Sequence, residues 1–136
     1  MTMDQEISTT EMNDSFDDKH FEFVKGAYMG VGPGWYNLVH TLCHSIDEYL
    51  KWRNRDRVMT EKLTLQITQI KEKFGTLRFY TGPVDDRIQG MIDFAEQMST
   101  VMCEQCGKPG QLRKLSWMQT LCDEHYEQAK PNENRI

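Results

Sequence analysis

Four residues near the C-terminus have the types and spacing of a metal site. Cys103 and Cys106 form a C-x2-C pair, fifteen residues follow, and Cys122 and His125 form a C-x2-H pair. Three thiolates and one imidazole make a complete tetrahedral ligand set for Zn²⁺ and leave no coordination position for a substrate. The spacing therefore predicts a structural zinc site, and we assign no catalytic residue to the chain.

The segments between and after these ligands predict the structure that positions them. Cys106 and Gly107 have the form of a zinc knuckle, and two short strands are expected over residues 111–115 and 117–121. A last helix should run from Asp123 to about Lys130, where Pro131 ends it. Knuckle, hairpin and helix in this order predict a treble-clef-like zinc-finger module over residues 103–130, packed on the core and followed by a polar tail at 131–136.

Two longer helices are expected in the preceding part of the chain. Apolar residues recur at steps of three and four over residues 35–53 and again over 84–102, which is the period of an amphipathic helix. Cys43 lies at the edge of the first apolar stripe and is interpreted as a small buried residue, since the zinc site needs only the other three cysteines. His40 and His44 have the i, i+4 spacing of a metal pair, but they lie opposite the stripe, which favours a solvent-exposed face.

Residues 62–81 have the pattern of a β-hairpin. Apolar and polar residues alternate over 63–68, and alternation returns over 76–81 with Gly75 as the turn residue. The glycine-rich segment 26–34 lacks the Lys of a phosphate-binding loop and is interpreted as an irregular turn. These elements predict an α+β fold, in which a core of residues 21–102 packs two helices on a small antiparallel hairpin.

Charge is spread unevenly along the chain. The formal net charge is -5, yet residues 1–18 hold six acidic residues and no Lys or Arg, and residues 1–20 are expected to be a disordered acidic tail. Residues 51–78 hold eight basic and three acidic residues, which leaves this stretch strongly basic. Basic side chains at a helix end also arise simply because cations suit its dipole. The candidate partner-binding residues are Lys51, Trp52, Arg53, Arg55, Arg57, Lys71, Lys73, Arg78, Arg113 and Lys114.

The N-terminus has neither the basic region nor the apolar region of a signal peptide, and no apolar run approaches the roughly 20 residues that span a bilayer. We therefore expect a cytoplasmic protein without membrane contact. Thiols stay reduced in that compartment, which favours metal ligation over disulfides.

Three stretches together resemble small, largely uncharacterised phage and prophage proteins. They are the KEKFGTLRFY-type hairpin within residues 69–80, the cysteine segments at 103–110 and 121–125, and Gly34-Trp35 before the first helix. The resemblance covers roughly residues 30–127. It implies a phage origin, and hence the cytoplasm of a host cell, but it brings no established activity and no catalytic residues.

These observations favour a non-enzymatic, zinc-stabilised phage accessory protein that binds a host macromolecule. The expected partner is a host protein such as a defence or regulatory factor, which the chain would inhibit. The alternative is a nucleic-acid-binding treble-clef module that uses the basic 51–78 surface. A zinc-finger-related nuclease is disfavoured because its hairpin should carry a His, and residues 111–121 contain none. A small-molecule substrate is not expected.

Overall fold

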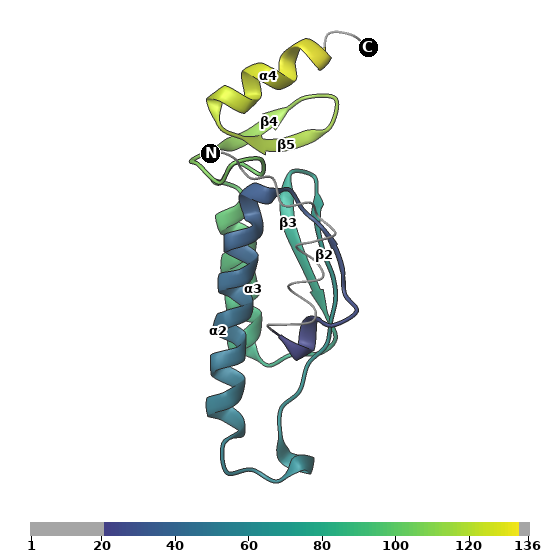
Figure 1. The fold of residues 1–136 in the computed structure, drawn as a ribbon, viewed down its shortest axis with the longest axis vertical. Helices are drawn as coiled ribbons and strands as arrows, with labels where there is room; N and C mark the ends of the chain where they lie inside the picture. The colour runs from purple at the N-terminus through teal and green to yellow at the C-terminus, as the bar shows by residue number, and fades with distance from the viewer. Residues whose placement is uncertain (1–20, 134–136) are drawn as a thin grey trace.

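The computed structural model describes residues 21–133 and shows an α+β fold, which confirms the predicted class. The expected tail at 1–20 and the last three residues of the expected polar tail lie outside the described residues. Three α-helices, two small sheets and short 3-10 turns make up the described chain (Figure 1): η2 Glu22–Val24, β1 Tyr28–Gly30, η3 Pro33–Trp35, α2 Tyr36–Asn54, η4 Met59–Glu61, β2 Ile67–Lys73, β3 Thr76–Thr81, α3 Asp86–Ser99, β4 Gln111–Lys114, β5 Met118–Leu121 and α4 Asp123–Glu133.

The two long helices, α2 and α3, begin and end within one to three residues of their predicted ranges. The apolar stripe of α2 is buried, and Cys43 lies fully buried on it, as predicted for a small core residue. In α3 the buried residues follow the same helical steps, and the carboxylate of Asp85 caps the helix by accepting a hydrogen bond from the Ile88 N–H at 2.9 Å. His40 and His44 are solvent-exposed, although the ring of Phe21 contacts His40 at a centroid distance of 5.4 Å.

The larger sheet differs from the predicted hairpin in two ways. It has three strands in the order β1-β2-β3, and β1 pairs in parallel with β2. The irregular turn expected over residues 26–34 was therefore wrong in part, since three of its residues form this edge strand. The first hairpin strand begins only at Ile67, because residues 62–66 instead run along α2, where the Asn54 side chain bonds both the N–H and the C=O of Leu63, at 2.7 and 2.8 Å.

Side chains from α3 cover the free edge of β3. The Ser99 hydroxyl accepts a hydrogen bond from the Leu77 N–H at 2.9 Å, and the Glu96 carboxylate accepts one from the Phe79 N–H at 3.0 Å. These contacts satisfy strand donors that would otherwise be available to another chain. α3 also packs against α2, and the sheet's inner face completes the core with Ile67, Ile70, Leu77 and Phe79.

The second sheet and the last helix lie at one end of an elongated molecule (Figure 1). β4 pairs antiparallel with β5, and α4 follows directly. α4 continues to Glu133, so the prediction that Pro131 ends it was wrong. Proline allows helical φ, so α4 runs through Pro131 at the cost of the backbone hydrogen bond that an N–H at this position would donate to the Glu127 C=O. The division into a 21–102 core and a 103–130 module stays a prediction.

Candidate metal centre

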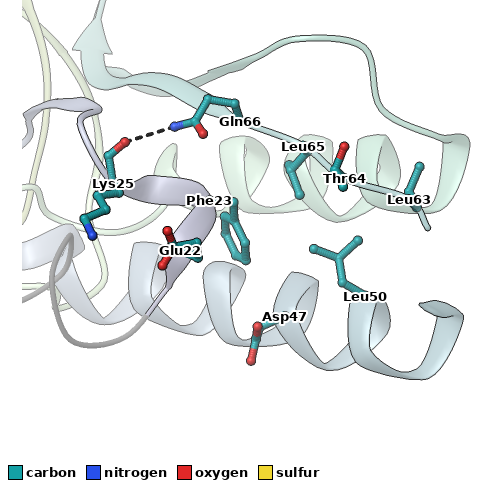
Figure 2. A pocket seen from close by; sticks show the side chains of 9 residues that line it. All are labelled: Glu22, Phe23, Lys25, Asp47, Leu50, Leu63, Thr64, Leu65 and Gln66. Carbon is teal, nitrogen blue, oxygen red and sulfur yellow. Dashed lines mark hydrogen bonds between the residues drawn. The ribbon is translucent and has the colours of Figure 1, made fainter. Parts of the chain in front are cut away.

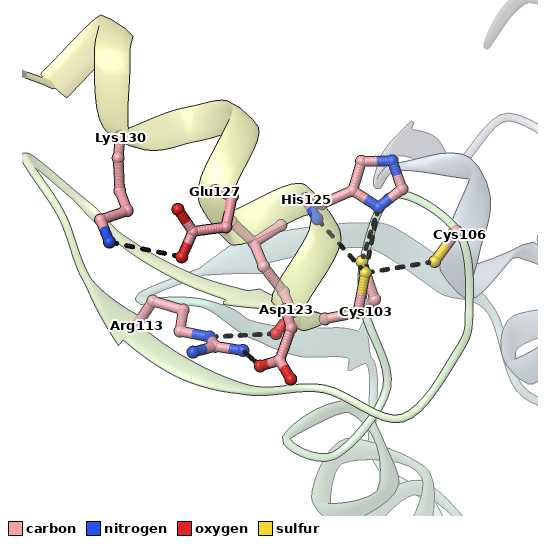
Figure 3. A network of polar contacts seen from close by, with 9 residues as sticks. Cys103, Cys106, Arg113, Asp123, His125, Glu127 and Lys130 are labelled. Carbon is pink, nitrogen blue, oxygen red and sulfur yellow. Dashed lines mark hydrogen bonds and ion pairs between the residues drawn. The ribbon is translucent and has the colours of Figure 1, made fainter.

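Three sulfur atoms and one imidazole nitrogen converge where α3, the β4–β5 sheet and α4 meet (Figure 3). Cys103 and Cys106 lie in the loop after α3, Cys122 follows β5, and His125 lies in the first turn of α4. The four ligand atoms all lie within 4.8 Å of one another. The sequence spacing therefore predicted a group of side chains that the fold does bring together.

Three of the distances within this group are close to those between the ligands of one metal ion. The Nδ1 of His125 lies 3.6 Å from the Cys103 Sγ and 3.2 Å from the Cys122 Sγ, and the sulfurs of Cys106 and Cys122 are 3.7 Å apart. Zinc bonds of about 2.3 Å to sulfur and about 2.0 Å to nitrogen place tetrahedral ligands about 3.5–3.8 Å from one another. The cysteines are unbridged, so all three sulfurs are available as ligands.

Backbone N–H groups shape the metal-binding loop and stabilise one of its sulfurs. Gly107 takes a φ of +81°, which turns the chain back so that its N–H donates to the Cys103 C=O at 2.8 Å. The backbone N–H of His125 donates to the Cys122 sulfur at 3.4 Å, and this hydrogen bond holds the pKa of the Cys122 thiol down to about 6. Desolvation raises the pKa of the Cys106 thiol to about 11. A cation at the centre would stabilise the thiolate forms of both cysteines.

The glycine-rich segment supports the metal-binding loop from the core side. The N–H of Gly34 donates to the Glu104 C=O at 2.7 Å, and a Cβ at Gly34 would lie only 2.1 Å from the Cys103 C=O oxygen. The N–H of Gly32 donates to the Glu104 carboxylate at 2.9 Å, and the Trp35 indole donates to the Met102 C=O at 2.8 Å. Sequence reasoning missed this contact, although the run of glycines was a usable signal of close backbone approach.

A second contact joins the tip of the β2–β3 hairpin to the β4–β5 sheet. The buried hydroxyl of Thr120 donates to the Gly75 C=O at 2.7 Å. A Cβ at Gly75 would lie 2.5 Å from the Leu112 side chain. The metal-binding region is thus attached to the core at two separate places, and both use glycine backbone.

Arg113, a predicted partner-binding residue, is engaged within the chain (Figure 3). Its side chain is only 12% exposed and bonds the Leu121 C=O at 3.1 Å and the Asp123 carboxylate at 2.8 Å. Its guanidinium also lies 4.3 Å from the ring centroid of Tyr126. Arg113 therefore links β4 to α4, whereas Lys114 is exposed.

The other predicted partner-binding residues fall in two separate regions. Lys51, Trp52, Arg53, Arg55 and Arg57 lie at the end of α2 that points away from the β4–β5 sheet (Figure 1). Trp52 is exposed and packs beside Tyr49 and Arg87, while Lys51 pairs with Asp47 at 3.1 Å. The second region contains Lys71, Lys73 and Arg78 on β2 and β3. The basic 51–78 stretch is thus two surfaces rather than one.

A concave surface that the sequence did not indicate lies between α2, η2 and residues 63–66 (Figure 2). Its volume is about 500 Å³. Phe23, Leu50 and Leu65 point into it, and the Gln66 amide closes one side by donating to the Lys25 C=O at 3.0 Å. None of the predicted partner-binding residues lines this surface, and its apolar floor continues the core.

Cys43 offers no second reactive centre. Burial raises the pKa of its thiol far above the ordinary range, with the nearby Asp47 carboxylate as a smaller cause. A thiol that stays protonated is a poor nucleophile.

Comparison with known proteins finds no match: no family model, no curated protein and no solved structure is significantly similar to this chain. Within residues 21–133, no helix combines the length and apolar character needed to cross a bilayer.

Proposed function

We propose that the Cys103, Cys106, Cys122 and His125 site holds Zn²⁺ and that this ion is structural. Three thiolates and one imidazole form a soft, closed set that suits zinc better than magnesium or calcium. The order of knuckle, β4–β5 hairpin and α4 supports a treble-clef arrangement. Because all four positions are taken by protein ligands, the ion has a folding role and no position for substrate.

We propose further that the chain is a phage accessory protein without enzymatic activity, which binds and inhibits a host protein in the host cytoplasm. The observation that carries this proposal is Phe74, at the tip of the β2–β3 hairpin. Its side chain is 66% exposed although its backbone has a φ of +55°, a left-handed conformation that an aromatic residue adopts at a cost. Asn or Gly would form this turn more readily.

Phe74 has the surroundings of an interface anchor. Its neighbour Gly75 is fixed by Thr120, so the ring projects from a rigid support. The exposed Leu112 side chain lies against Gly75, and the Lys73 Nζ lies 5.7 Å from the centroid of the Phe74 ring. An apolar residue held rigidly beside a cation fits an apolar pocket on a partner with an acidic group at its edge.

The substitution Phe74→Asn tests this function, because it removes the anchor and improves the turn. We expect thermal stability to hold or rise, by up to about 1 kcal/mol. Affinity capture from bacterial lysates, quantified by mass spectrometry, should recover a stoichiometric partner with the wild-type chain. Recovery should fall at least tenfold with Phe74→Asn. The proposal fails if no partner is recovered across several hosts, or if the variant recovers it equally well.

A second candidate function is nucleic-acid binding, and one observation favours it. Lys71 and Arg78 are paired across β2 and β3, and the Lys71 Nζ lies 5.7 Å from the ring centroid of Tyr80. Cations beside exposed aromatic rings are typical of surfaces that contact nucleic acids.

A further inference from the structure

The outer face of the three-stranded sheet presents its side chains in ordered rows. The strand register aligns Tyr28, Gln69 and Tyr80 in one row across β1, β2 and β3. The next row contains Gly30, Lys71 and Arg78, and Lys73 follows one row further along β2. Met29, Ile70 and Phe79 point to the opposite, buried face. Two aromatic rings thus lie beside three cations on one open surface.

The ring of Tyr28 lies over Gly30 on this face of the sheet. A Cβ at Gly30 would lie between 2.5 and 2.9 Å from the hydroxyl oxygen and two ring carbons of Tyr28. The missing side chain of Gly30 therefore makes room for the ring, whose other face is free, since Tyr28 is 61% exposed. Tyr80 is 38% exposed at the other end of the row.

No ion pair among residues 21–133 involves Lys71, Lys73 or Arg78, the three cations of this face. The one nearby carboxylate on β2, that of Glu72, accepts a hydrogen bond from the Gly75 N–H at 2.8 Å and belongs to the other face of the strand. Arg78 also lines a concave surface with Asp93 and Glu96 of α3, so Lys71 and Lys73 are the cations of this face most available to an anionic ligand.

We infer that this face, with Tyr28 and Tyr80 as stacking surfaces and Lys71, Lys73 and Arg78 as phosphate contacts, binds single-stranded nucleic acid. The inference rests on the second candidate function and gives it a site and a ligand class. Two strand spacings separate the tyrosines by about 10 Å, and the cation row lies about 7 Å further along the strands. Unpaired bases stack on aromatic side chains while cations contact the backbone, so two or three nucleotides cover this area.

A duplex does not match the same arrangement. Its bases are stacked on each other and are closed to the two tyrosine rings, so only the cations would contact it. An acidic peptide would likewise pair with the cations and make no use of the exposed Tyr28 ring. Both are ligands whose binding the tyrosine substitutions should leave largely unchanged.

Fluorescence anisotropy with a labelled twelve-nucleotide oligo-dT, its RNA counterpart oligo-U and a twelve-base-pair duplex tests the inference on the full chain. We expect oligo-dT or oligo-U to bind at least tenfold more tightly than the duplex, with affinity falling as salt rises. The double variant Tyr28→Leu/Tyr80→Leu keeps apolar bulk and should lose at least tenfold in affinity. Lys71→Gln/Arg78→Gln should lose affinity and reduce the salt dependence by about two phosphate contacts.

The matched control is Lys51→Gln/Arg55→Gln/Arg57→Gln, which removes the other basic surface and should retain binding. Equal melting temperatures and metal content show that the variants are folded. If the control loses binding while the sheet variants retain it, nucleic-acid binding stands but this site is overturned. If no oligonucleotide binds at low salt, even when the six carboxylates of residues 1–18 are replaced by amides in the full-length chain, both the site and the second candidate function are overturned.

Discussion

At the scale of single residues, the proposed metal centre depends on groups that are not among its four ligands. Gly34 illustrates this, because its Cα lies so close to the metal-binding loop that a Cβ would be 2.1 Å from the Cys103 oxygen and 2.5 Å from the Gly107 nitrogen. Both neighbours are backbone atoms of a loop that the ligands constrain. They cannot move aside without displacing Cys103 or Cys106.

Gly34→Ala should therefore destabilise the protein by about 2–3 kcal/mol or more, as overpacking of a rigid site does. The control is Gly90→Ala in α3, where a Cβ meets nothing within 4 Å. That substitution should stabilise the protein by about 0.5–1 kcal/mol, because alanine favours the helix. Urea denaturation of both variants measures the two free energies of unfolding. Equal effects of the two substitutions would contradict the close contact at Gly34.

Arg113 and its neighbour Lys114 offer a second residue-scale comparison. Arg113→Ala should cost about 1–3 kcal/mol, because the Leu121 C=O loses its side-chain donor and Tyr126 loses the packing of the guanidinium. Lys114→Ala should change stability by less than about 0.5 kcal/mol, since Lys114 is exposed. Thermal unfolding of both variants measures the two effects. If Arg113→Ala leaves the stability unchanged, Arg113 has no structural role and its side chain is available to a partner.

At the scale of elements, the junction between α2 and α3 is held by a polar contact. The hydroxyl of Tyr49 donates a hydrogen bond to the Asp85 carboxylate, which also caps α3. The Tyr49 hydrogen bond, followed by that from the Ile88 N–H, lowers the pKa of Asp85 below its ordinary 3.8. The same bond raises the pKa of Tyr49 above its ordinary 10.0.

The sign of the pH dependence follows from these directions. A lowered carboxyl pKa stabilises the fold above pH 3.8, and this stabilisation is lost as the pH falls through the folded-state pKa. A raised tyrosine pKa stabilises the fold below pH 10.0 and is lost as the pH rises through the folded value. Tyr49→Phe should therefore destabilise the protein at pH 7 by about 0.5 kcal/mol, since both groups are only half-buried and remain partly screened by solvent.

Urea denaturation of the wild type and Tyr49→Phe from pH 7 to pH 3 measures this difference. The gap between the two proteins should narrow towards pH 3, because protonated Asp85 gains less from the tyrosine hydroxyl. A gap that stays constant or widens in acid would show that the hydrogen bond does not govern the pKa of Asp85.

The elements also show what sequence patterns can predict. Helical periodicity over 35–53 and 84–102 and ligand spacing over 103–125 are local properties, and they identified α2, α3 and the four ligands. β1 was missed because three residues cannot show a period, and its pairing partner lies some forty positions away. Residues 63–66 have the alternation of a strand but lie against α2 and form no strand. Tertiary contacts with α2 therefore outweighed the local strand pattern.

At the scale of the whole molecule, two contacts make the metal centre continuous with the core. The glycine-rich segment and the β2–β3 tip both bond the metal-binding region. Removing the ion should therefore lower the stability of the entire chain. We expect a chelator to lower the melting temperature of one cooperative transition, as followed by circular dichroism. Two separate transitions, with only the smaller sensitive to the chelator, would show that the two regions fold independently.

X-ray absorption spectroscopy of the purified protein measures the ligands of the proposed closed metal site. We expect one zinc per chain, bound by three sulfur atoms at about 2.3 Å and one nitrogen at about 2.0 Å, with no oxygen ligand. Cys106→Ser should lose the zinc or replace one sulfur. A wild-type site with a water or other oxygen ligand, fewer than three sulfurs, or no bound metal would overturn the assignment of a closed zinc site.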